Sequence, residues 1–103
     1  MALKMVANSV LCGTSEVTIY ETASNTRAQI IRLSVANNGS SSTWFSVFVH
    51  PASGTSAPII NRRVILRYVT DNCIELIGHE LMPKARLTVI SGGSVNVTLT
   101  VDE

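Results

Sequence analysis

Hydrophobic and polar residues alternate along most of the chain, which is the period-two pattern of β-strands with one buried face. The clearest example is residues 94–102, where Val95, Val97, Leu99 and Val101 alternate with polar side chains. Nowhere do apolar residues recur at the i, i+3, i+4, i+7 spacing of an amphipathic helix over three turns. We therefore predict an all-β chain in which any helix is a single turn.

The same alternation, together with the turn residues between the apolar runs, predicts about eight short strands. Turn signals recur every 8 to 12 residues or so without helical spacers, which is typical of an antiparallel β-sandwich or jelly roll. A chain of 103 residues fits one such domain, residues 1–103. The predicted strands are residues 9–12, 16–20, 29–37, 43–50, 63–70, 72–77, 86–90 and 94–102.

Three segments between these strands have the composition of turns or loops. Gly92 and Gly93, flanked by serines, predict a tight hairpin with positive-φ glycines that pairs residues 86–90 with 94–102. The run of asparagine, glycine and serine at residues 37–42 predicts another turn. Residues 51–58, which begin and end with proline, predict the longest exposed loop.

The strand at residues 43–50 is apolar on both faces. Phe45 and Val47 lie on one face, and Trp44 and Phe48 lie on the other. One set must therefore meet either a second layer of the same fold or a partner chain. Tryptophan is common both in sandwich cores and at the centres of protein interfaces, so both readings stay open for Trp44 and Phe48.

Composition narrows the classes of partner. Only 15% of the residues are charged, against about 25% in an average soluble domain, which favours a protein that works inside an assembly. A formal net charge of +1 gives no basic patch, so we expect no nucleic-acid partner. The sequence has no apolar run that would span a bilayer and does not start with a secretory signal, so we expect no membrane partner and synthesis in the cytoplasm.

The arginines form the one cluster of charge. Arg63 and Arg67 would share a face of the strand predicted at residues 63–70. Guanidinium groups suit carboxylates on another protein, which makes these arginines candidate interface residues beside Trp44 and Phe48. The alternative is that Arg63 and Arg67 simply lie on a solvent-exposed face of the strand.

No catalytic, cofactor-binding or metal site is predicted. The only histidines, His50 and His79, fall at a strand end and a turn, and no Gly-x-Ser-x-Gly motif is present. Cys12 and Cys73 lie far apart without a CxxC motif, so free buried thiols are expected, with a disulfide as the alternative.

Residues 19–37, 75–87 and 93–103 together resemble small β-sandwich proteins of tailed-phage virions, namely capsid decoration (cement) proteins and tail-fibre-like modules. The first segment has a Tyr-ended strand, a small-residue turn and a strand closing on Ala36 and Asn37. The other two look like the closing half of the same module. In that group Gly-Asp usually follows the proline of the second segment, whereas Lys84 and Ala85 follow Pro83 here.

This resemblance implies a non-enzymatic structural protein of the virion. The function we expect is a capsid decoration subunit that stabilises the shell through contacts with the major capsid protein or other virion proteins. A homo-oligomer is expected, and a trimer in particular, because decoration proteins of the resembled group commonly sit on three-fold positions. The alternative is a tail or tail-fibre accessory module that binds carbohydrate or a host receptor.

Overall fold

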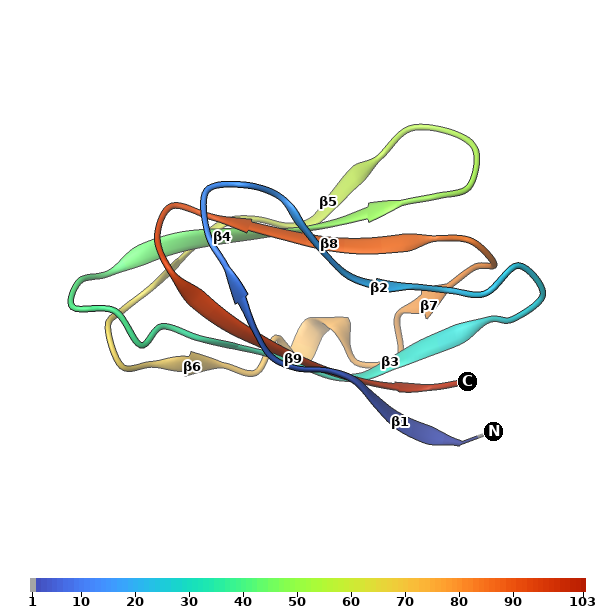
Figure 1. Ribbon diagram of the computed structural model, residues 1–103, viewed down its shortest axis with the longest axis horizontal. Coiled ribbons are helices and arrows are strands. Elements are labelled where there is room, and N and C mark those ends of the chain that lie inside the picture. Colours follow the sequence, from blue (N-terminus) through green and yellow to red (C-terminus); the bar gives the residue numbers. More distant parts are fainter. Residues whose placement is uncertain (1) are drawn as a thin grey trace.

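The computed structural model describes residues 2–103 and consists of two antiparallel β-sheets packed face to face (Figure 1). The predicted all-β sandwich is confirmed. A single 3-10 turn, η1 (Ile74–Leu76), is the only helix in the described part of the chain. The strands are β1 (Leu3–Cys12), β2 (Val17–Glu21), β3 (Ala28–Ala36), β4 (Thr43–His50), β5 (Ala57–Ile65), β6 (Thr70–Asp71), β7 (Glu80–Leu81), β8 (Arg86–Ser91) and β9 (Val95–Asp102).

The strand order is that of a jelly roll. One sheet, called sheet A below, has the order β1-β9-β3-β6, with the short β7 also paired to β3. The other, sheet B, has the order β2-β8-β4-β5. Apart from the β4–β5 hairpin and the step from β6 to β7, each connection carries the chain from one sheet to the other. If β6 and β7, which both pair with β3, are counted as one interrupted strand, eight strands are exchanged between the two sheets in this way, as in the jelly-roll class.

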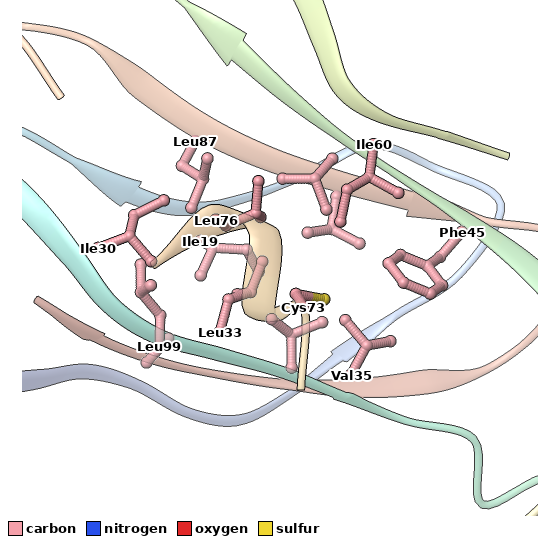
Figure 2. Close-up of a cluster of buried hydrophobic side chains, with 14 of the residues drawn as sticks. Ile19, Ile30, Leu33, Val35, Phe45, Ile60, Cys73, Leu76, Leu87 and Leu99 are labelled. Carbon is pink, nitrogen blue, oxygen red and sulfur yellow. The ribbon is translucent and has the colours of Figure 1, made fainter. Parts of the chain in front are cut away.

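The core fills the space between the sheets, as the alternation predicted. Leu33 and Leu99 of sheet A and Phe45 and Leu87 of sheet B are completely buried. Figure 2 shows these side chains converging with Leu76, which enters the same cluster from η1. Because both sheets supply apolar inner faces, the sandwich forms one continuous hydrophobic cluster.

The predicted hairpin between residues 86–90 and 94–102 is wrong. β8 belongs to sheet B and β9 to sheet A, so the segment between them is an arch that crosses the sandwich. Neither Gly92 nor Gly93 has a positive φ. Gly92 has a different role, because a Cβ atom at this position would lie 2.4 Å from Nε1 of Trp44. The glycine is required by the close approach of the indole ring.

The strand predicted at residues 63–70 is correct only for residues 63–65, which end β5, and the strand predicted at residues 72–77 is wrong. β5 ends at Ile65, a turn follows, and only Thr70–Asp71 pairs again, this time with β3 in sheet A. Tyr68 and Cys73 have left-handed backbones with φ of 61° and 45°, which interrupt any extended strand, and η1 begins after Cys73. The apolar alternation past Ile65 belongs to exposed side chains and does not mark a buried face.

Two further boundaries differ from the prediction. β1 begins at Leu3, six residues before the predicted strand at Ser9, because its pairing with β9 continues to the chain terminus. The predicted loop at residues 51–58 is shorter, since β5 begins at Ala57. Ala2 and Glu103 exchange backbone hydrogen bonds of 3.0 and 3.2 Å, so the two ends of the chain lie side by side (Figure 1).

Candidate functional site

Exposed apolar side chains gather where the edge strands β5 and β6 meet. Val64, Leu66 and Ile74 are 68%, 62% and 76% exposed, and Val69 is 42% exposed. All four line one open hollow of about 420 Å³, which we call the apolar hollow. Its remaining lining residues are Arg63, Ile65, Thr70, Asp71, Asn72, Cys73 and Glu75.

Arg63 forms one wall of the apolar hollow through ion pairs within its own chain. Its Nη1 lies 3.3 Å from Oδ2 of Asp71 and 3.0 Å from Oε1 of Glu75, and its Nη2 contacts the other oxygen of Glu75. The hydrogen bonds from Arg63 hold the pKa of Glu75 below its ordinary value. The guanidinium therefore ties sheet B to β6 and η1 and keeps the wall in place.

Arg67 does not share a strand face with Arg63, contrary to the prediction. It lies in the turn after β5, is exposed, and has its Cζ atom 5.7 Å from the centroid of the Tyr68 ring. Its charged groups therefore face solvent beside the hollow, while those of Arg63 are engaged.

A buried asparagine, Asn37, connects the two ends of the turn that follows β5. The Nδ2 atom of Asn37 donates to the carbonyls of Ser41 (3.0 Å) and Ile65 (3.1 Å). Its backbone donates to Val69 (2.9 Å) and accepts from Tyr68 (2.7 Å). The sequence pattern places Asn37 at the end of a predicted strand and the start of a turn. Its 1% exposure shows a second role, since a buried amide with satisfied hydrogen bonds fixes the segments around it.

The structure separates the two candidate aromatics of β4. Trp44 is half-buried on the outer face of sheet B, directly across from Val64 of the apolar hollow, and the Cζ of Arg62 lies 4.0 Å from its ring centroid. Phe48 pairs with Pro58 and Thr88 further along β4. Trp44, Arg63 and Arg67 thus lie at or next to the hollow, and Phe48 does not.

A second polar cluster lies on the outer face of sheet B. Nδ1 of His50 is 2.5 Å from Oγ of Ser56, and its Nε2 is 2.7 Å from Oε2 of Glu16 and 3.0 Å from Oγ1 of Thr88. Thr88 also donates to Glu16 at 2.5 Å. Hydrogen bonds from Thr88 first, then from His50, lower the pKa of Glu16.

Serine, histidine and carboxylate in this order form the relay used in nucleophilic hydrolysis. That chemistry also requires an oxyanion-binding pair of donors and a cleft beside the serine. Ser56, His50 and Glu16 do not line the apolar hollow. The hydrogen bonds of the cluster join β4 and β8 to the segment before β2 and to the 51–56 loop.

The two cysteine thiols are buried inside the sandwich. Cys12 and Cys73 are free and buried, and burial raises the pKa of Cys12 to about 11 and that of Cys73 to about 12. Residues 2–103 contain no group of three His, Cys, Asp or Glu side chains that could hold a metal ion. No helix in this range is long and apolar enough to cross a membrane.

No protein-family model, curated protein or solved structure matches this chain.

Proposed function

We propose that this protein is a non-enzymatic structural subunit of a tailed-phage virion, and specifically a capsid decoration subunit that docks through the apolar hollow. The observation that carries the proposal is the concentration of Val64, Leu66, Val69 and Ile74 around one open depression. Contiguous exposed apolar surface marks an interaction site in soluble proteins. The assignment to a phage virion rests on the resemblance of residues 19–37, 75–87 and 93–103, and jelly rolls recur among viral capsid domains.

Docking at this surface would be adhesive. Burial of the apolar side chains supplies the favourable free energy, while Arg63 keeps its carboxylate partners when water is excluded. Trp44 beside Val64 extends the surface onto sheet B and has the character of an interface anchor. The partner is the major capsid protein or another virion protein, together with copies of the same chain.

Co-sedimentation with capsids that lack this protein tests the proposal. Leu66→Asp places a charge in the apolar hollow, and we expect it to weaken capsid binding at least tenfold. Leu11→Asp is the matched control, because Leu11 is 65% exposed, close to the 62% of Leu66, but lies on β1 away from the hollow. Trp44→Ala should cost about 1 to 3 kcal/mol of binding free energy. Equal binding by wild type and Leu66→Asp, with both folded, would contradict the proposal.

The oligomeric state is tested separately by sedimentation equilibrium. A trimer three times the 11.1 kDa chain mass is expected for a subunit that occupies three-fold positions. A monomer at every concentration, together with no pelleting on capsids, would refute the assembly role.

A further inference from the structure

A second hollow, of about 310 Å³, lies on the outer face of sheet A and is unlike the first. Its floor is formed by Ser34 of β3 and by Thr98 and Thr100 of β9, with Arg32 and Asn96 around them. We call this the polar hollow. It shares only Thr70 with the apolar hollow, so it is a separate surface.

The register of the sheet arranges the polar groups of this hollow in rows. Ser34 lies directly opposite Thr98, and Arg32 lies opposite Thr100. Nδ2 of Asn38 donates to Oδ1 of Asn96 at 3.1 Å, which fixes the orientation of both amides. Asn96 is also bound to Ser9, because its Nδ2 donates to the Ser9 carbonyl at 3.2 Å. Oγ of Ser34 donates to Oδ1 of Asn72 at 3.4 Å, and Oγ1 of Thr98 accepts from the backbone N–H of Ser9 at 3.1 Å. Toward the hollow, Ser34 therefore keeps a hydroxyl acceptor, Thr98 keeps a hydroxyl donor, and Thr100 keeps both.

Arg32 is the one charged residue that lines the polar hollow. Its Nη2 donates to Oδ1 of Asn72, a neutral amide, at 3.4 Å. Arg63 and Arg27, by contrast, are paired with carboxylates of their own chain. Asp102 follows Thr100 on the same face of β9, but it lines a different hollow with Arg27 and Glu80. The polar hollow thus combines a row of neutral polar groups with a guanidinium that is not neutralised by a lining carboxylate.

We propose that the polar hollow binds an acidic saccharide. The guanidinium of Arg32 suits a sulfate or carboxylate group through charge-assisted hydrogen bonds. Ser34, Thr98 and Thr100 complement sugar hydroxyls, which likewise donate and accept. The volume is at the small end of the range for ligand sites, so one or two sugar residues are the expected occupants. This activity is additional to docking on a capsid and does not depend on it.

Amide chemical-shift mapping by NMR on the whole chain tests the site with four probes: a dextran sulfate oligosaccharide, a hyaluronan oligosaccharide, a neutral dextran oligosaccharide of the same length and sodium sulfate. The two acidic saccharides distinguish sulfate from carboxylate as the anionic group. We expect shifts centred on Arg32, Ser34, Thr98 and Thr100 with at least one acidic saccharide, and affinity at least tenfold lower for neutral dextran.

Two variants test whether saccharide binding depends on the side chains of the polar hollow. Arg32→Gln should reduce affinity for the acidic saccharide at least tenfold, and Thr100→Val, which removes a hydroxyl and keeps the shape, about threefold. Arg67→Gln is the matched control, because it changes the net charge equally at an exposed arginine outside the hollow, and it should leave affinity unchanged. Unperturbed spectra away from the hollow establish that each variant is folded.

Four outcomes would overturn the proposal. Equal losses from Arg32→Gln and Arg67→Gln would mean non-specific attraction to charge. Sodium sulfate binding as tightly as the oligosaccharide at the same residues would mean an anion site without saccharide recognition. Shifts centred outside sheet A would show that the saccharide binds elsewhere. No shifts with any probe at millimolar concentration would show that the polar hollow does not bind saccharides.

Discussion

Replacing Gly92 with alanine tests the packing of the arch against sheet B. A Cβ atom at this position would lie 2.4 Å from Nε1 of Trp44, 2.8 Å from its Cδ1 and 2.9 Å from its Cε2. These distances are far below the ordinary 3.5 to 4.0 Å or so between non-bonded carbon atoms, so the indole or the arch must move. The rigid ring has little room, because Arg62 covers one of its faces.

The expected cost combines two effects. Overpacking of this kind typically destabilises by about 1 to 3 kcal/mol. Displacing the ring also weakens its contact with Arg62, which is worth about 0.5 to 1 kcal/mol at an exposed site. We therefore expect Gly92→Ala to lower the free energy of unfolding by about 2 kcal/mol, and each kcal/mol corresponds to roughly 4 to 8 °C in Tm for a domain of this size.

Urea titration followed by tryptophan fluorescence measures this directly, because Trp44 is the only tryptophan. Gly93→Ala is the control: its nearest contact, Oγ1 of Thr43, would be 3.3 Å away, and its effect should be within about 0.5 kcal/mol. In a Trp44→Ala background the cost of Gly92→Ala should largely disappear. The same cost in both backgrounds would show that the indole is not the reason for the glycine.

Three further predictions concern stability and reactivity. Oγ1 of Thr22 is buried without a hydrogen-bond partner in the described residues, so Thr22→Val should raise the free energy of unfolding by about 1 kcal/mol in a urea titration, and Thr22→Ser should not. The pKa of Glu75 is lower in the folded chain than its ordinary 4.5, so its ion pair with Arg63 stabilises the fold fully above pH 4.5 and loses this effect as the pH falls through the lowered pKa. Glu75→Gln should therefore cost about 0.5 to 1 kcal/mol at pH 7, and urea titrations should show this cost shrinking steadily as the pH is lowered from 4.5. Cys12 and Cys73 are buried and have raised pKa values, so neither thiol should react with dithionitrobenzoate at pH 8 until urea unfolds the chain. Fast labelling of the native protein would show that the two thiols are not enclosed.

The sequence was most informative where alternation coincides with burial. Val95, Val97, Leu99 and Val101 were predicted to share an inner face, and all four are completely buried. Alternation, however, reports which side of a strand faces the core and carries no information about which sheet the strand joins. The glycines at residues 92 and 93 therefore predict a hairpin where the structure has an arch, because both kinds of connection join strands with the same periodicity.

The candidate site was only partly predictable for a related reason. The role of Trp44, Arg63 and Arg67 as interface residues stays a prediction from residue type. Arg63 lines the apolar hollow, whereas Trp44 and Arg67 only adjoin its lining residues Val64 and Leu66. Val64 and Leu66 were assigned to a regular strand because they alternate with arginines, yet both are exposed. The ion pairs of Arg63 with Asp71 and Glu75 depend on how β5 meets β6 and η1, which local patterns do not encode. The Asp71-Asn72 pair after a short apolar run was the available signal for a turn.

The positions of the two hollows lead to a last prediction. The apolar hollow lies along the edges formed by β5 and β6, whereas the polar hollow lies over β3 and β9 on the outer face of sheet A. Thr70 of β6 is their common boundary. A capsid partner that covers the apolar hollow would therefore leave Arg32, Thr98 and Thr100 open to solvent.

We accordingly expect capsid-bound protein to capture a fluorescent dextran sulfate oligosaccharide with an affinity within about threefold of that of the free chain. This is measured by fluorescence anisotropy on decorated capsids, with capsids lacking the protein as the blank. Arg32→Gln should abolish the signal without reducing decoration, because Arg32 does not line the docking surface. Loss of saccharide binding by wild type on decoration would mean that docking covers sheet A, and the docking surface would then have to be placed there instead of at β5 and β6.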